Sequence, residues 1–232
     1  MRLRRLLPVL CAFWGVLAAQ TSATSGTVDG LWLLERLTVA PERLDASYRR
    51  SSFKHWVDAD RDCQDTRAEV LAAEDLSGSP LGCRVVSGRW VSWLDGRTFT
   101  SARSLDVDHL VALKEAWRSG AADWDASRRE AFANDLGYEW SLAAVSASSN
   151  RSKSDRDPAR WLPAGPVRCE YALRWVAVKF RWGLAVDARE RSALQGVFSA
   201  PGCAGSLIEV PPTVHVGSSR LVVRDASGTS AP

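Results

Sequence analysis

Two aspartates and a histidine stand close together near the middle of the chain. Asp106 and Asp108 alternate with Val107 in the stretch from Leu105 to His109, whose apolar and polar residues alternate as in a half-buried strand. Side chains two residues apart project to the same face of a strand, so the two carboxylates share a face while His109 lies across from them at the end of the strand. Two carboxylates on one face favour a cation site.

His109 is one of only three histidines, and the others, His55 and His215, lie far from it in the sequence. A histidine in a half-buried strand is more often a structural hydrogen-bonding residue than a catalyst. Beside two carboxylates, however, a neutral imidazole with an ordinary pKa of about 6.5 is suited to take a proton from water at neutral pH. His109 is therefore the candidate general base.

The strand that carries these residues is expected to lead directly into a helix. Residues 110–118 have helical periodicity that ends near Gly120, and a second helix is expected over 125–134. A short strand over 142–145 follows, and then a polar helix start at 148–150. The recurring order is strand, strand, helix.

The flanking segments are expected to complete an α+β domain. They comprise a helix over 66–76 behind a capping box that begins at Thr66, a β-meander over 83–100 with turns at Ser87-Gly88 and Asp95-Gly96, a helix over 167–182 ended by Gly183, and a last helix from Asp187 to Phe198.

The N-terminus has the layout of a secretory signal peptide. An arginine-rich start is followed by an apolar run from Leu6 to Ala19 and by small residues up to Ala23. The run is shorter than the ~20 residues of a membrane-spanning helix, so cleavage is favoured over an uncleaved anchor, and no stable membrane association is expected. We expect a secreted protein, extracellular or periplasmic, with a signal peptide over 1–23, a lead-in segment over 24–47, the domain over 48–203 and a disordered tail over 204–232.

Four cysteines remain after this targeting segment, namely Cys63, Cys83, Cys169 and Cys203. An even number of cysteines in an exported chain favours two disulfides, and three pairings are possible. We favour the sequence-local pairs Cys63–Cys83 and Cys169–Cys203. The alternative is a zinc cluster, but no Cys-x-x-Cys spacing is present and secreted thiols oxidise.

The charge balance gives no global signal of nucleic-acid binding. The 30 basic and 27 acidic residues include Arg2, Arg4 and Arg5 of the predicted signal peptide, so the mature chain is expected to be neutral. A nucleic-acid enzyme of this composition needs a local basic surface. The segment 150–181 is one candidate, with eight basic and three acidic residues, although a solvated charged face is the simpler interpretation.

The stretch Leu105-Asp-Val-Asp-His-Leu-Val-Ala-Leu113, followed by Asn150-Arg-Ser-Lys153 and Trp161-Leu-Pro163, resembles the secreted branch of the HNH endonuclease family. The resemblance covers roughly residues 48–200 and includes Asp62-Cys-Gln-Asp-Thr-Arg67, Cys83-Arg-Val-Val-Ser-Gly-Arg-Trp90 and Cys169-Glu-Tyr-Ala172. It implies a ββα-metal (HNH) motif embedded in a disulfide-stapled single domain. It also implies an endonuclease that acts on DNA and that could act on RNA.

In that family the acid before the histidine holds a divalent metal, the histidine activates water, and a helix asparagine completes the metal site. By resemblance these roles fall on Asp108, His109 and Asn150. Carboxylate and carboxamide oxygens suit one Mg²⁺ ion, with Mn²⁺ or Ca²⁺ as alternatives. Such an ion would neutralise the scissile phosphate and stabilise charge on the leaving 3′-oxygen.

Three basic residues are candidate substrate ligands. Arg151 and Lys153 stand beside Asn150 near a helix start and could contact phosphate oxygens, and solvated surface charge is the alternative. The resemblance places Arg67 near the reaction site. Trp90, Trp93 and Trp161 could stack on bases, although core packing is the commoner role of tryptophan.

Ser141 departs from the family pattern. A helper residue, usually Asn or His, is expected nine positions before the metal asparagine, and this chain has Ser141 there. Because serine has a shorter reach, the alternative function is a degenerate domain that binds nucleic acid or a protein partner without cutting. A purely structural secreted domain would leave the acid, histidine and asparagine unexplained.

A second cation site is conceivable in the segment Asp58-x-Asp-x-Asp62 with Glu69, which has the spacing of an EF-hand calcium loop. Cys63 stands where that loop needs its turn glycine, and the predicted helix cap at Thr66 lies inside the loop. Both features disfavour calcium binding there.

Overall fold

The structure is a computed structural model that describes residues 26–44, 47–78, 82–217 and 220–224. The predicted signal peptide over 1–23 lies outside these residues. Within the described ranges, no helix is both long and apolar enough to span a bilayer.

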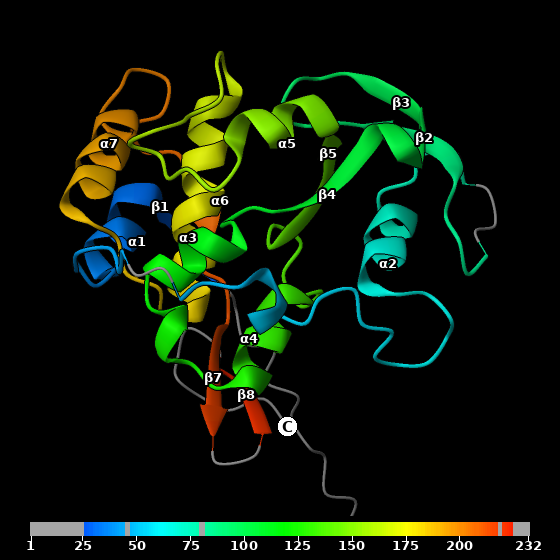
Figure 1. Ribbon diagram of the computed structural model, residues 1–232. Helices are drawn as coiled ribbons and strands as arrows, with labels where there is room; N and C mark the ends of the chain where they lie inside the picture. The colour runs from blue at the N-terminus through cyan, green and yellow to red at the C-terminus, as the bar shows by residue number, and fades with distance from the viewer. Residues whose placement is uncertain (1–25, 45–46, 79–81, 218–219, 225–232) are drawn as a thin grey trace, which may run out of the picture.

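The centre of the fold is an antiparallel pair of strands followed by a helix (Figure 1). Strand β4 (Leu105–His109) pairs with β5 (Leu142–Ser146), and the register places His109 opposite Leu142. Helix α5 (Ala147–Lys153) begins directly after β5, where the Ser146 side chain accepts a hydrogen bond from the Ser149 amide. This is the strand, strand, helix order expected from the sequence.

The connection from β4 to β5 is a compact helical segment. It contains α3 (Leu113–Arg118), the 3₁₀ helix η3 (Ala121–Asp123) and α4 (Ala126–Ala133). Asp125 caps α4 by accepting a hydrogen bond from the Arg128 amide, and the helix ends beside the last residue of β4. The sequence predicted both helices, because their periodicity and caps are local signals.

Side chains cover the outer edge of β5. The Ala144 amide donates to both carboxylate oxygens of Glu74, at 3.0 and 3.2 Å, and the Ser146 amide donates to the Ser92 hydroxyl at 3.0 Å. Glu74 follows α2 (Thr66–Ala73), and Ser92 follows β2 (Ser87–Val91). The backbone amides at the outer edge of β5 are therefore paired with side chains, so this edge is not open to a further strand.

The predicted β-meander is wrong in part, because β2 pairs only with β3 (Thr98–Ser101), in a sheet separate from β4 and β5. Gly96, with φ +69°, lies in the connection as expected. Ser87-Gly88, however, belongs to β2, where the register shifts between Ser87 and Trp90. Gly88 therefore lies in a local bulge of the strand and not in the predicted turn. The cap of α2 also differs, since Asp65 rather than Thr66 accepts the capping hydrogen bond from the Ala68 amide.

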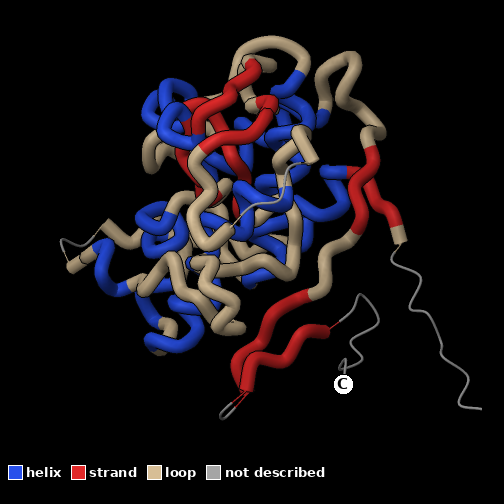
Figure 2. The backbone as a smooth tube through the Cα atoms, turned by 90° about the vertical axis from the view of Figure 1, so that its right-hand side faces the viewer, coloured by secondary structure: helices blue, strands red, loops and turns tan. Residues whose placement is uncertain are grey.

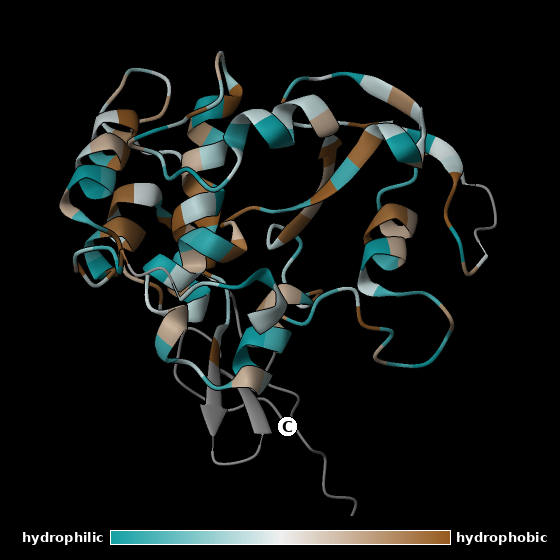
Figure 3. Cartoon of the chain, viewed as in Figure 1, coloured by the Kyte–Doolittle hydropathy of each residue, from teal (hydrophilic) through white to brown (hydrophobic). Residues whose placement is uncertain are grey.

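The main hydrophobic core surrounds α6 (Val167–Trp182), which packs against α1 (Gly30–Arg36) and α7 (Ala188–Phe198). Hydrophobic residues gather on α1 and on the central strands (Figure 3). A Cβ at Gly30 would lie 2.4 Å from the Phe198 ring, so only glycine permits this close approach of α1 to α7. Gly183 ends α6 in the left-handed conformation, with φ 64°, as predicted.

Both ends of the described chain differ from the sequence expectation. The segment predicted as a lead-in contributes β1 (Thr27–Asp29) and α1, whose Leu33 and Leu34 are fully buried. The segment predicted as disordered contains β6 (Leu207–Glu209), which pairs with β1, and the hairpin of β7 (Thr213–Gly217) and β8 (Arg220–Arg224), seen at the lower edge of Figure 2. The pairing of β1 with β6 joins distant segments, so local periodicity does not reveal it, whereas β7 and β8 are neighbours in sequence and lie in a tail whose composition predicted disorder.

Two disulfides join the described cysteines in the pairing that the sequence favoured. The Cα atoms of Cys63 and Cys83 are 5.1 Å apart, and those of Cys169 and Cys203 are 5.5 Å apart. The first closes the loop around α2, and the second ties the start of α6 to the segment after α7. Both distances lie in the ordinary range for disulfides.

The basic segment 150–181 does not form one continuous basic surface. Four of its cations are buried and paired: Lys153 with Asp108, Arg174 with Glu170, Lys179 with Glu115 and Glu190, and Arg181 with Asp135. Charge counting along the sequence cannot separate such buried pairs from a surface patch. A basic surface for nucleic acid cannot use these four buried cations, whereas Arg151, Arg156 and Arg160 of the segment are exposed.

Candidate active site

A pocket of about 380 Å³ lies where β4 ends and α5 passes beside it. Asp108, His109 and Asn150 all line it, so the fold brings together the three residues that the sequence singled out. Arg151 is on its wall as well. The remaining lining residues are Tyr48, Arg50, Val107, Ala112, Leu113, Lys114, Ser154 and Asp155.

The His109 ring is held on both faces and at one nitrogen. It stacks on Trp56 and Phe132, with ring centroids 5.5 and 6.5 Å away, and its Nε2 lies 2.9 Å from the Ala133 carbonyl oxygen. A carbonyl oxygen can only accept a hydrogen bond, so Nε2 carries the hydrogen and Nδ1 is the basic nitrogen of the neutral ring. Burial lowers the pKa of His109 to about 3, which keeps the ring unprotonated at neutral pH.

The Asp108 carboxylate is buried with one oxygen satisfied and one not. Its Oδ1 lies 3.0 Å from the Lys153 ammonium, whereas Oδ2 has no hydrogen-bond partner among the described residues. Burial raises the pKa of Asp108 to about 6, against the opposing effect of Lys153. A buried oxygen without a partner is rare and needs an explanation, and a bound cation is one.

Lys153 points into the protein, whereas the sequence analysis expected it to contact phosphate oxygens of the substrate. Its side chain is fully buried, and its ammonium donates to the carbonyl oxygens of His109 and Leu110, at 3.0 and 3.1 Å, as well as to Asp108. The lysine therefore fixes the end of β4 against α5. Its three donors are used within the protein, so none remains for substrate.

Asn150 is oriented by the other carboxylate of β4. Its Nδ2 donates to Asp106 Oδ2 at 3.0 Å, and no described residue donates a hydrogen bond to its carboxamide oxygen. Asp106 and Asp108 thus both face α5, as the alternation of β4 predicted, and Asp106 acts as a positioning residue. The free Oδ2 of Asp108 and the free oxygen of Asn150 are hard ligands that fit a divalent cation such as Mg²⁺.

Ser141, the expected helper, forms no hydrogen bond with the His109 ring in the described part of the chain. Its hydroxyl donates to Asp135 Oδ2 at 2.7 Å, and that carboxylate also accepts from Arg181 and Trp182. Orientation of the ring comes instead from the Ala133 carbonyl. A backbone carbonyl can do this in any sequence, which is why residue types did not reveal it.

Arg151 and Arg67 lie at different places. Arg151 is exposed on α5 and lines the pocket of Asp108 and His109. Arg67 lines a separate pocket of about 580 Å³ beside the Cys63–Cys83 disulfide, and its guanidinium donates to the Ala102 and Leu105 carbonyls. The structure therefore does not bring Arg67 into the candidate reaction centre.

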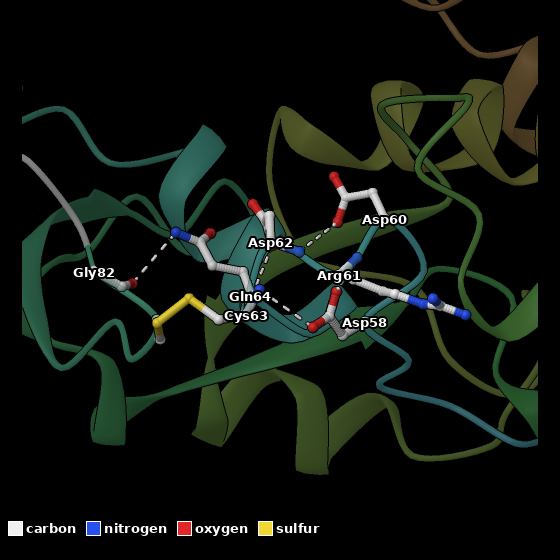
Figure 4. The surroundings of a disulfide bond; sticks show 8 residues. Asp58, Asp60, Arg61, Asp62, Cys63, Gln64 and Gly82 are labelled. Atoms are coloured by element: carbon white, nitrogen blue, oxygen red, sulfur yellow. Dashed lines mark hydrogen bonds between the residues drawn. A yellow bond between two sulfur atoms is a disulfide. The ribbon is translucent and has the colours of Figure 1, made fainter.

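The acidic segment before α2 uses its carboxylates to fold its own loop (Figure 4). Asp58 accepts hydrogen bonds from the amides of Arg61 and Cys63, at 2.7 and 3.2 Å, and both of these residues have positive φ. Asp58, Asp60 and Asp62 are exposed and have oxygens within 4.8 Å of one another, but Glu69 is not part of this group. The EF-hand spacing is therefore not matched by EF-hand geometry.

The three tryptophans singled out for base stacking have partners within the protein. Trp90 is buried, and its Nε1 donates to the Leu71 carbonyl at 2.7 Å, so it is a core residue. Trp93 stacks on Tyr171 and lies under the Arg174 guanidinium. Trp161 is half-buried, and its Nε1 donates to the Ser152 hydroxyl.

Among the lining residues that the sequence reasoning did not single out, Tyr48 and Arg50 lie farthest along the chain from the motif. They precede β4 by more than fifty residues and match no chemical motif. The only available signal was their place at the expected start of the domain. Because they lie far from the motif in sequence, their place in the pocket could not be predicted.

Two comparisons with known proteins found a match. Residues 80–197 match the family of GmrSD restriction endonucleases, C-terminal domain, and this range includes Asp108, His109 and Asn150. An uncharacterized secreted protein of Arthroderma benhamiae is 39% identical over 171 residues, which cover 72% of this chain and 82% of the relative. No solved structure matches significantly.

The secretion predicted from the N-terminus is confirmed. The fungal relative is named as secreted, and both cysteine pairs of the described chain are disulfides, as expected outside the cell. The protein is secreted. The extent of the family match and the identity to this relative show that the chain belongs to the GmrSD restriction endonuclease C-terminal domain family, which suggests nuclease activity.

Proposed function

We propose that the protein is a secreted, metal-dependent endonuclease that hydrolyses phosphodiester bonds of DNA, with His109 as general base and Asp108 and Asn150 as metal ligands. One observation carries this proposal. Asp108, whose buried Oδ2 has no partner among the described residues, lines the same pocket as His109. A residue that can bind a cation and a residue that can accept a proton therefore line one cavity.

The protein's own part in the reaction is proton transfer and orientation. Nδ1 of His109 takes a proton from a water molecule, whose oxygen attacks phosphorus while the bond from phosphorus to the 3′-oxygen breaks. The Nε2–H bond to the Ala133 carbonyl keeps the ring in place and stabilises the imidazolium that forms. A phosphodiester anion beside the ring raises the pKa of His109 towards the working pH.

A divalent cation held by Asp108 Oδ2 and the Asn150 carboxamide oxygen would supply charge neutralisation at the phosphate and at the leaving oxygen. Both ligand atoms are hard oxygens, so Mg²⁺ is the first candidate and Mn²⁺ or Ca²⁺ the alternatives. Arg151, exposed at the rim, is placed to bind a non-bridging phosphate oxygen.

The direct test is degradation of plasmid DNA by the purified protein in Mg²⁺, followed by addition of a chelator and then of excess metal. We expect cleavage that stops with the chelator and resumes with the metal. RNA in the same buffer shows whether the enzyme also uses that substrate. Intact DNA and RNA across Mg²⁺, Mn²⁺ and Ca²⁺ would contradict the proposal.

The alternative is a domain that binds nucleic acid or a protein partner without cutting. It rests on Ser141, which stands where the family has its helper residue and whose hydroxyl donates to Asp135 instead. If that alternative holds, the wild type does not cleave DNA in any of these metals but retards it in a gel. Cleavage restored by Ser141→Asn would then mark the native site as impaired.

A further inference from the structure

Arg50 reaches the candidate active site from outside the segment that matches the family. The match covers residues 80–197, but the pocket around Asp108 and His109 is also lined by Tyr48 and Arg50. Arg50 begins the short 3₁₀ helix η1 (Arg50–Ser52). The pocket is therefore completed by an N-terminal segment of the same chain.

The hydrophobic core fixes this segment in place. Phe53, directly after η1, is fully buried, and its ring contacts Tyr48, Trp117 and Phe132, with centroids 6.1 to 6.4 Å apart. Its amide donates to the Arg50 carbonyl at 3.1 Å. Phe132 is also the ring on which His109 stacks, so one aromatic cluster holds both Arg50 and the candidate base.

Arg50 brings an uncompensated positive charge to the pocket. It is exposed, and no carboxylate of the described chain forms an ion pair with it. Lys114, which lines the same pocket, differs because its ammonium lies 3.0 Å from Asp155. Arg151 likewise has no carboxylate partner within the described ranges. Two arginines from different elements, η1 and α5, thus offer free guanidinium groups to one cavity.

We propose that Arg50 is a further catalytic residue, which binds the non-bridging oxygens of the scissile phosphodiester together with Arg151. A guanidinium donates two parallel hydrogen bonds to such oxygens, and the interaction strengthens as negative charge accumulates on them during attack. The inference rests on the proposed nuclease function and adds a residue to it. It also places Arg50, which lies outside the matched range 80–197, in the candidate reaction centre.

The test compares Arg50→Ala and Arg50→Lys with Arg49→Ala in the full-length protein. Arg49 is the matched control, because it is the neighbouring exposed arginine, is not part of the pocket lining, and carries the same charge. Rates are measured with a DNA oligonucleotide and with bis(p-nitrophenyl) phosphate in Mg²⁺, and thermal melting checks the fold. Wild type and His109→Ala are assayed in parallel.

For Arg50→Ala we expect kcat to fall about 100-fold or more on both substrates, as for loss of one donor to a developing charge. Arg50→Lys should recover part of kcat, because lysine keeps the charge but not the paired geometry. Arg49→Ala should stay within about threefold of wild type, since Arg49 does not line the pocket and its charge adds only to the general attraction for the substrate.

The outcomes separate this inference from the proposed function. An active wild type with an inactive His109→Ala, together with Arg50→Ala as fast as Arg49→Ala, would overturn the role of Arg50 and leave the nuclease intact. A rise in KM with unchanged kcat would also overturn it, because Arg50 would then stabilise the bound substrate and the transition state equally. An inactive wild type would overturn both. If Arg50→Ala melts early, Arg50→Lys and Arg50→Gln decide by the same kcat comparison.

Discussion

At the scale of single residues, the ion pair of Lys153 and Asp108 joins the stability of the fold to the chemistry of the site. Both side chains are buried, 3.0 Å apart, and neither has another ion partner in the described chain. Lys153 keeps Asp108 in its charged form in a place where burial favours the neutral form. A charged Asp108 is the form that a metal ligand requires.

Removal of the lysine should therefore be costly. Lys153→Met leaves a buried carboxylate uncompensated, and we expect the free energy of unfolding to fall by about 3–5 kcal/mol. Denaturant titration measures this change, with Arg151→Met as the control for an exposed cation on the same helix. The double variant Asp108→Asn with Lys153→Met should recover part of the loss. Equal stability of Lys153→Met and Arg151→Met would show that the pair is not buried.

A substitution at Ser141 distinguishes a structural role of this residue from a catalytic one. Because its hydroxyl donates to Asp135 and not to His109, Ser141→Ala should lower the free energy of unfolding by about 1 kcal/mol and change kcat only a few-fold. Urea unfolding and cleavage kinetics on the same preparation give both numbers. A loss of kcat near 100-fold with unchanged stability would return Ser141 to the role of catalytic helper.

The sequence identified the polar residues of the candidate site but not their partners. Asp108 and His109 could be singled out by the alternation of acids beside a histidine, whereas Asn150 was added by the resemblance to the HNH family. Lys153 was expected at a phosphate because a lysine beside Asn150 looks the same in sequence whether it points outward or inward. Its direction depends on the depth of α5 against β4, which is a property of tertiary packing.

At the scale of elements, the site depends on how α2 covers the edge of β5. Glu74 accepts the Ala144 amide with both carboxylate oxygens, and burial raises the pKa of Glu74 to about 7. The folded protein thus holds this proton more tightly than the unfolded chain, whose glutamate has an ordinary pKa. The stability that protonation of Glu74 contributes is complete below about pH 4.5 and is lost as the pH rises through about 7.

Glu74→Gln should remove this dependence. We expect the fall in unfolding free energy between pH 5 and pH 8 to be smaller in the variant than in wild type, because glutamine does not titrate. Thermal or urea unfolding across this range measures it. Burial also raises the pKa of Glu190 to about 7. Glu190 is present in both proteins, so its contribution to the pH dependence cancels in the comparison. Identical pH profiles would contradict the assignment to Glu74.

Helices were predictable where their signals are local. The bounds of α4, α6 and α7 follow caps and glycines that can be read within a few residues, such as Asp125, Gly183 and Asp187. Strands β7 and β8, with five residues each, were missed because the composition of the tail predicted disorder. Strand β6 was missed because it has only three residues and pairs with β1, far away in sequence. Periodicity cannot identify a partner at that distance.

At the scale of the whole molecule, the two disulfides lie at opposite sides of the central motif. One closes a loop of 20 residues around α2, and the other closes a loop of 34 residues that includes α6 and α7. Replacement of Cys63 and Cys83 by serine should lower the free energy of unfolding by roughly 2–4 kcal/mol, chiefly by freeing the unfolded chain. Denaturant unfolding measures this, and an unchanged midpoint would contradict it.

The central claim is that His109 is the base of a metal-dependent nuclease, and one rate measurement tests it most directly. Single-turnover cleavage of a DNA oligonucleotide in Mg²⁺ is compared between wild type, His109→Ala and His215→Ala, a matched histidine control on the terminal hairpin. The account predicts that His109→Ala is slower by about 100-fold or more while His215→Ala is unchanged. Cleavage by His109→Ala at the wild-type rate would contradict it.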